Sequence, residues 1–274
     1  EAPVKLTFWT FHSSAEKDFM ASLPEQYMKE HPGVEIEFVV IPQDEYMSSK
    51  LTTAFAAGAG PDVFFMSPGD FLKYANSSLA MDLTPYFTPE LLDDFLPSSI
   101  EAVTVDGKIC AIPFEVELLG LYYNKDMLSA AGIAPPATWD ELIAATSALT
   151  KDKIAGLLIE PNKGYYQNFT WYPFLWQDVE KKQASFDNQA AVDALKLWGD
   201  LIKAGAPSKI SIPGTFDISL LGTGQAAMQV SGTWAIADLE KKYADQNIGV
   251  VPLPVAPGGK PATCAGGWKV MVNA

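Results

Sequence analysis

The chain has 274 residues, of which 48% are hydrophobic and 19% charged, and its formal net charge is −14. These values are typical of a globular protein long enough for two folded domains, and they exclude a disordered chain. All 19 basic residues are lysine, so the sequence lacks the arginine fork with which proteins usually bind phosphates and nucleic acids. We therefore exclude a nucleic-acid partner and favour a neutral or cationic ligand.

Neither a membrane span nor a metal centre is expected from the sequence. No apolar run approaches the roughly 18 residues that cross a bilayer. The chain opens at Glu1 without a basic signal segment, which indicates a mature or trimmed N-terminus. The two cysteines match no metal or redox spacing, and both histidines lie within the first 31 residues. We expect no metal and no cofactor.

The first 70 residues alternate between strand and helix patterns. Strands are predicted at 4–10, 34–41 and 62–66, and helices at 14–30 and 44–57. This order predicts a parallel, doubly wound sheet, whose ligands bind beyond the carboxyl ends of the strands. None of those ends carries a glycine-rich phosphate loop.

A second α/β region is predicted to follow several short helices. Its strands are expected at 118–123, 154–159, 226–230 and 248–251, and its helices at 125–131, 138–149, 165–176, 188–203 and 233–243. Thr138 and Glu141 have the spacing of a capping box, and Asn124 is expected to cap the helix that follows it. The last residues predict a turn and one apolar strand.

The stretch "PFEVELLGLYYN", residues 113–124, places two carboxylates at the head of an apolar strand. Side chains two residues apart share one face of a strand, so Glu115 and Glu117 are expected to point the same way. Three interpretations are open at this point: a catalytic pair, solvated acids without a function, or hydrogen-bond acceptors for a ligand. The seven tryptophans offer flat rings that suit a hydrophilic ligand with an apolar face, although most are expected to pack in a core.

Seven segments in one order resemble the extracellular solute-binding proteins of ABC sugar importers, the maltose-binding-protein-like family 1. They are "LTFWTFH", "KEHPGVEIEF", "AAGAGPDVFFMSPGD", "DGKICAIPFEVELLGLYYNKDML", "AAGIAPPATWDEL", "GQAAMQVSGTWAI" and "GGW". The resemblance implies a periplasmic-binding-protein-like (class II) α/β fold: two lobes, each a sheet flanked by helices, joined by hinge strands. It implies capture of a mono- or short oligosaccharide by hinge closure and its delivery to the membrane permease, without chemistry on the ligand.

The resemblance also sets the expected domain boundaries. Lobe one is expected at 1–110 with a returning strand at 267–274, lobe two at 113–263, and hinge segments at about 109–113 and 262–267. Family members usually continue beyond "GGW" with further helices, so we expect a C-terminal truncation or a tail on another chain. A truncated chain is expected either to self-associate through exposed apolar surface or to lack a competent closed state. The expected location is periplasmic or extracellular, with or without a lipoprotein tether.

The resemblance and the acid pair together give eleven candidate ligand-binding residues. They are His12, Ser13, Asp44, Asp70, Glu115, Glu117, Asn168, Trp171, Trp234, Gly267 and Trp268. Glu117 falls where relatives use a glutamate to accept sugar hydroxyls, and charged acceptors make the stronger hydrogen bonds. Met66 stands where some relatives carry an aromatic platform, which argues against a long maltodextrin.

Cys110 and Cys264 fall just before the strands that run side by side between the lobes in this family. Because an exported protein meets an oxidising compartment, a disulfide across the hinge is expected. The alternative is two buried free thiols.

Two other functions stay open. A glycoside hydrolase would use Glu115 and Glu117, since carboxylates about 5–10 Å apart perform that chemistry. Against it, a general acid needs a raised pKa in an apolar pocket, whereas two acids on one strand face share one environment. The second alternative is a binder of a polyamine or another small cation, which the acidity of the chain admits.

Overall fold

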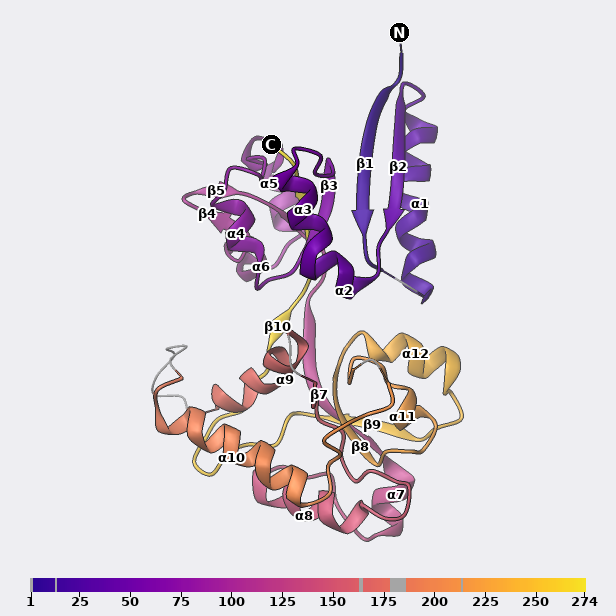
Figure 1. Cartoon of the computed structure of the whole chain (residues 1–274), viewed down its shortest axis with the longest axis vertical. Coiled ribbons are helices and arrows are strands. Elements are labelled where there is room, and N and C mark those ends of the chain that lie inside the picture. Colours follow the sequence, from indigo (N-terminus) through magenta and orange to yellow (C-terminus); the bar gives the residue numbers. More distant parts are fainter. Residues whose placement is uncertain (1, 13, 163–164, 178–185, 213) are drawn as a thin grey trace. The chain divides into compact units, whose positions relative to one another are not determined.

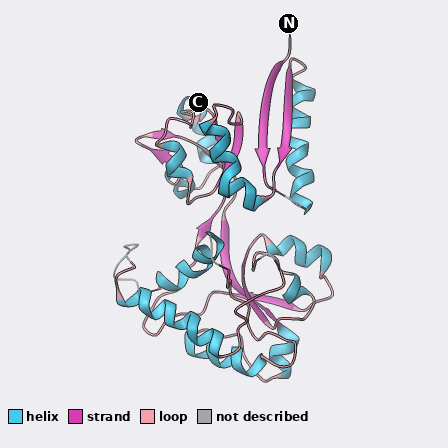
Figure 2. Cartoon of the chain, viewed as in Figure 1, coloured by secondary structure: helices cyan, strands magenta, loops and turns pink. Residues whose placement is uncertain are grey.

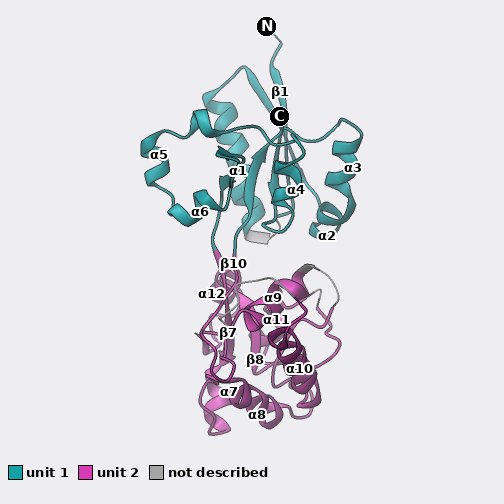
Figure 3. Cartoon of the chain, turned by 90° about the vertical axis from the view of Figure 1, so that its left-hand side faces the viewer, with its two compact units in different colours: residues 1–116, 266–274 teal, residues 117–265 magenta. Residues whose placement is uncertain are grey.

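The chain crosses twice between two separately folded units (Figure 3). Unit 1 comprises residues 1–116 and 266–274, and unit 2 comprises residues 117–265. This computed structural model describes residues 2–12, 14–162, 165–177, 186–212 and 214–274. The first crossing lies a few residues beyond the predicted segment 109–113, and the second lies inside the predicted segment 262–267.

The sheet of unit 1 has the strand order β2-β1-β3-β11-β6. Figure 1 labels β1, β2 and β3 of this sheet, and Figure 2 draws the strands in magenta. The strands of the sheet are β1 (Val4–Thr10), β2 (Val34–Val40), β3 (Val63–Met66), β6 (Ile112–Pro113) and β11 (Lys269–Val272). β1 is parallel to β2 and to β3, as predicted, whereas β11 is antiparallel to β3 and β6. Lys269 pairs with both Met66 and Pro113, so the start of β11 lies at the carboxyl ends of β3 and β6.

Helices of unit 1 connect these strands. They are α1 (Ser14–Glu30), α2 (Gln43–Glu45), a π-helical turn (Tyr46–Lys50), α3 (Leu51–Ala56), α4 (Phe71–Ala75), a 3₁₀ turn (Thr84–Tyr86), α5 (Pro89–Asp93) and α6 (Pro97–Glu101), followed by the hairpin of β4 (Thr104–Val105) and β5 (Lys108–Ile109). Phe64, Phe65 and Met66 are fully buried, which explains why β3 is apolar on both faces.

In unit 2, β7 (Glu117–Asn124) pairs with three strands: β8 (Met228–Gly232), β9 (Ile248–Val251) and β10 (Ala265–Gly266). β8 and β9 are antiparallel to β7. The prediction of a continuous strand at 154–159 is wrong. This segment forms only two isolated parallel bridges to the chain around β8, from Ala155 to Ala226 and from Leu158 to Gln229.

The helices of unit 2 carry the predicted caps. They are α7 (Lys125–Ala130), α8 (Trp139–Leu149), α9 (Tyr165–Leu175), α10 (Gln189–Lys203), α11 (Ser219–Gly222) and α12 (Ala235–Lys242). The capping box is confirmed, because the backbone N–H of Glu141 donates to Thr138 and the backbone N–H of Thr138 donates to the Glu141 carboxylate. Asn124 accepts from two N–H groups at the start of α7. Among the described residues no helix combines the length and apolarity that a bilayer crossing requires.

Candidate functional site

Five side chains meet where β1, β3 and β6 end and β11 begins in unit 1. We call Phe11, His12, Phe114, Glu115 and Trp268 the sheet-edge cluster. The rings of Phe11 and Trp268 are 4.1 Å apart between centroids, and those of Phe11 and His12 are 4.6 Å apart and stacked. The backbone N–H of Trp268 donates to the Glu115 carboxylate over 3.3 Å. An indole, an imidazole and a carboxyl group therefore share the edge at which parallel sheets bind ligands.

His12 is held among aromatic rings. It is only 3% exposed, its Nδ1 lies 2.5 Å from Thr10 Oγ1, and its ring meets Phe65 edge-on with 4.5 Å between centroids. Burial lowers the pKa of His12 to about 4, so the imidazole is neutral at neutral pH. His12 offers a ligand a hydrogen-bonding ring and no positive charge.

Glu115 differs from its neighbour Glu117 in position and environment. β7 begins at Glu117, so Glu115 precedes the strand, and the prediction that both acids point from one strand face is wrong. The two residues also belong to different units. Burial is the main cause that raises the pKa of Glu115 to about 7, the Trp268 N–H works against it, and the charge of Glu16 adds to the rise.

Gly267 has a backbone role at this edge. Its φ is +127°, a conformation that residues with a side chain rarely adopt. A Cβ at this position would collide with the backbone carbonyl oxygen of Glu115. The absent side chain therefore allows the close chain approach in which Trp268 N–H reaches the Glu115 carboxylate.

The other candidates of unit 1 have different surroundings. Asp44 is exposed in α2. The Asp70 carboxylate accepts from Ser67 Oγ over 3.1 Å, and the Asp70 N–H donates back to the same hydroxyl, which forms a local turn before α4. Ser13 lies outside the described residues.

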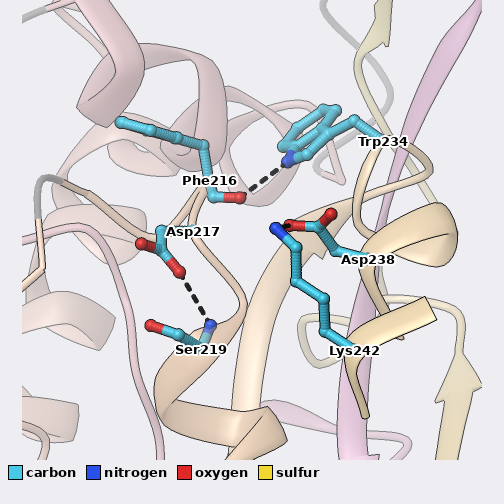
Figure 4. A network of polar contacts seen from close by, with 6 residues as sticks. All are labelled: Phe216, Asp217, Ser219, Trp234, Asp238 and Lys242. Atoms are coloured by element: carbon cyan, nitrogen blue, oxygen red, sulfur yellow. Dashed lines mark hydrogen bonds and ion pairs between the residues drawn. The ribbon is translucent and has the colours of Figure 1, made fainter. Parts of the chain in front are cut away.

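In unit 2, three aromatic residues lie beside Trp234. We call Tyr166, Phe169, Phe216 and Trp234 the indole cluster. The Trp234 Nε1–H donates to the Phe216 carbonyl oxygen over 3.0 Å (Figure 4), and the ring of Tyr166 meets the indole edge-on at 6.0 Å. A Cβ at Gly232 would collide with the Trp234 ring, so the glycine allows the indole to lie over β8. With its nitrogen already bonded, Trp234 can offer a ligand only the face of its ring.

Two neighbouring contacts fix the segments that carry this cluster. The Ser219 N–H donates to the Asp217 carboxylate over 2.8 Å just after Phe216, and Lys242 pairs with Asp238 over 2.9 Å along α12 (Figure 4). The first contact holds the start of α11, and the second lies within the helix that follows Trp234. Local contacts therefore stabilise both chain segments next to the Trp234 ring, the one after Phe216 and the one after Trp234.

Tyr166 contacts the Trp234 ring, and its pKa responds to burial and to two carboxylates, Glu160 and Glu117. Burial is the main cause that raises the pKa of Tyr166, and the charges of Glu160 and then Glu117 add to it. Glu160 is 2% exposed, and its carboxylate accepts from the Thr215 N–H over 2.7 Å. Neither Tyr166 nor Glu160 was predicted from the sequence; a glutamate that ends an apolar segment directly before Pro161 was the available signal for Glu160.

The remaining candidates of unit 2 have other surroundings. Trp171 is 8% exposed and belongs to the core, with its ring stacked on Phe186, so it packs the unit. Asn168 is exposed on α9.

The predicted disulfide is not formed. Cys110 and Cys264 are free, buried thiols. Cys110 packs in the core of unit 1 and Cys264 in the core of unit 2, where its Sγ lies 3.2 Å from the Phe169 carbonyl oxygen. Each thiol is thus used as a core side chain of its own unit. The described residues contain no group of three or more His, Cys, Asp or Glu side chains that could hold a metal ion.

The chain belongs to the family of bacterial extracellular solute-binding proteins, whose family model matches residues 12–274. Its curated relatives include a putative binding protein of Brucella abortus, 25% identical over 92% of this chain and 63% of the relative. Another is the maltotriose-binding protein of Pyrococcus abyssi, 29% identical over 91% of this chain and 53% of the relative. The chain thus spans 53–63% of the length of these relatives.

Solved structures of similar fold carry sugars or sugar-like ligands. The GacH receptor of Streptomyces glaucescens, studied unliganded and with acarbose, matches with a TM-score of 0.83 and 29% identity over 100% of this chain and 72% of its own. Maltose-bound MalE3 of T. maritima matches with a TM-score of 0.81 and 26% identity over 98% of this chain and 72% of its own. A solute-binding protein of Thermotoga lettingae bound with α-D-tagatose matches with a TM-score of 0.83 and 25% identity over 99% and 73%. The predicted class II α/β fold is confirmed.

Proposed function

We propose that this chain is the substrate-binding component of an ABC importer and that it captures a mono- or short oligosaccharide by closure of its two units. The sugar is then delivered unaltered to a membrane permease. The family membership and the sugars named for the similar structures support this proposal.

The observation that carries the proposal is the indole cluster of unit 2, in which Trp234 is fixed through its nitrogen and keeps a partly exposed ring. In unit 1, Trp268 donates its backbone N–H to Glu115. In unit 2, the Tyr166 ring contacts the Trp234 indole, and the charge of Glu117 adds to the rise that burial causes in the pKa of Tyr166. Indole faces suit the apolar C–H faces of a pyranose ring, and carboxyl groups accept from its hydroxyls. A neutral polyol also fits an acidic chain without arginine.

The same geometry favours binding over hydrolysis. Glu115 has the raised pKa of a general acid, but it precedes β7 whereas Glu117 opens it, so the two acids are not held side by side on one strand. The matched family consists of solute-binding proteins. We therefore assign these carboxyl groups to hydrogen bonding, and we place the protein outside the cytoplasm, free or tethered to a membrane.

A ligand panel tests the proposal. Calorimetric titration of the chain with glucose, galactose, maltose and maltotriose is expected to give saturable binding, and chromatography should recover each sugar intact. Trp234→Ala should weaken the binding at least about tenfold, because a stacked ring and its buried contact area are lost. Trp176→Ala is the matched control, since Trp176 is exposed and stacks on Tyr172. Binding of spermidine without any sugar, or turnover of a sugar, would overturn the proposal.

A further inference from the structure

A buried lysine stands at the ligand edge of the sheet in unit 1. Lys269 is 8% exposed, and no other lysine among the described residues is buried. It opens β11 and pairs in register with Met66 and Pro113, so its backbone lies at the carboxyl ends of β3 and β6. Lys269 is not among the eleven candidate ligand-binding residues.

The ammonium group of Lys269 has little to compensate its charge. Its Nζ donates to the Gly267 carbonyl oxygen over a long 3.4 Å and lies 5.9 Å from the ring centroid of Phe71. Within the described residues no carboxylate lies within 4.0 Å of it, whereas the lysines that form ion pairs are at least half exposed. Burial lowers the pKa of Lys269, which reflects the unfavourable desolvation of its charge.

A purely structural role does not account for this arrangement. A methionine or leucine would fill the same space beside Phe71 without desolvating a charge. An uncompensated buried charge is among the more destabilising features of a fold, and such groups concentrate at functional sites. The bond to the Gly267 carbonyl directs the ammonium back toward the residue that precedes Trp268. An ammonium has three donors, and the one long bond leaves two for a ligand.

We propose that Lys269 is a specificity-determining residue that binds a carboxylate of the ligand, so that the preferred substrates are sugars with one acid group, such as uronates or aldonates. This inference rests on the proposed function. It departs from the neutral or cationic ligand that the net charge of −14 favours, because one buried ammonium selects a single carboxylate; phosphorylated or polyanionic ligands stay disfavoured.

Matched sugar pairs test the inference. The chain is titrated calorimetrically with glucose and glucuronate, galactose and galacturonate, and maltose and maltobionate. At least one acid is expected to bind about tenfold or more tightly than its neutral partner. Lys269→Met, which keeps the length of the side chain, should abolish this preference and leave the neutral sugar within about threefold. Lys73→Met should keep the preference, since Lys73 is an exposed lysine near the Tyr74 ring of the same unit.

The outcomes separate this inference from the proposed function. Neutral sugars that bind while their acids do not would overturn the inference and leave the proposed function intact. An acid preference that survives in Lys269→Met would also overturn it. Absence of binding by every member of the panel would overturn both. If Lys269→Met does not fold, Lys269→Gln provides a second test with the same expectations.

Discussion

The two clusters use the same residue type in different ways. Trp268 of the sheet-edge cluster is 9% exposed, packs on Phe11 and directly precedes β11, so it belongs to the core of unit 1. Trp234 of the indole cluster is only partly buried, lies over Gly232 and is fixed by one hydrogen bond to a loop carbonyl. Removal of the core tryptophan should mainly lower the stability of the fold, whereas removal of the tryptophan with an open ring face should mainly weaken ligand binding.

Their ionisable groups differ as well. The sheet-edge cluster contains His12 and Glu115, whose pKa values burial shifts in opposite directions, to about 4 and about 7. In the indole cluster the buried phenol of Tyr166 has its pKa raised and stays neutral at any physiological pH. Of the two clusters, the sheet-edge cluster should therefore show the marked pH response near neutrality.

The largest expected difference is between alanine variants of the two tryptophans. Trp268→Ala should lower the free energy of unfolding by about 3–5 kcal/mol, because a buried indole leaves a cavity. Trp234→Ala should lower it by only about 1–2 kcal/mol, since its ring is partly solvated, and should instead weaken sugar binding. Urea unfolding followed by far-UV circular dichroism measures both. Equal losses of stability would contradict the assignment of different roles.

A smaller effect should separate Gly267 from an ordinary glycine. Gly267→Ala should lower the free energy of unfolding by about 2–3 kcal/mol, because φ is +127° and the new Cβ meets the Glu115 carbonyl. Gly33→Ala is the matched control in the same unit, where a Cβ meets nothing within 4 Å and φ is not in the left-handed range. Thermal unfolding of both variants, each compared with the unmodified chain, measures this difference in stability. A Gly267→Ala variant as stable as Gly33→Ala would show that the close approach to Glu115 is not required.

The pH dependence of stability should expose the two opposed ionisations in unit 1. Between about pH 4.5 and 6.5, folded Glu115 keeps a proton that the unfolded chain has lost, so its contribution to stability falls as pH rises to 7. Over nearly the same range, folded His12 lacks a proton that the unfolded chain holds, so its contribution rises with pH from about 4 to 6.5. The two slopes oppose each other in the unmodified chain.

Single variants separate those slopes. Glu115→Gln should leave a rise in stability from about pH 4 to 6.5, and His12→Asn should leave a fall from about pH 4.5 to 7, each on the order of 2–3 kcal/mol. Urea midpoints measured from pH 4 to 8 provide the test. Parallel pH profiles for both variants would rule out the opposed ionisations.

Much of the fold could be predicted because its signals are local. The strand at 4–10, the helix at 14–30 and the capping box at Thr138 follow from hydrophobic period and capping chemistry, and the structure reproduces each. The strand at 154–159 was predicted wrongly because an apolar run indicates that a segment is buried, but not that it pairs with a neighbouring strand. This segment is buried beside β8 but forms only isolated bridges.

The candidate site was harder to predict because it depends on contacts between distant segments. Trp268 and Gly267 were found through a motif, but the bond from Trp268 to Glu115 joins positions 153 apart. The raised pKa of Glu115 and the charge of Lys269 at the same edge follow from burial, which spacing along the chain does not reveal. The same limit explains Trp171, whose motif indicated a ligand role although the side chain packs in the core of unit 2.

The smallest expected effect concerns the thiols, one in the core of each unit. Because Cys110 and Cys264 are free and buried, dithiothreitol should change the unfolding free energy by less than about 0.5 kcal/mol, whereas reduction of a native disulfide typically costs about 2–5 kcal/mol. Alkylation with iodoacetamide without reductant should add no label to the native chain and two labels in urea, read by intact mass. A chain that takes no label in urea until it is reduced would establish the disulfide after all. Since each thiol packs in the core of a different unit, such a result would also require both cores to rearrange around their cysteines.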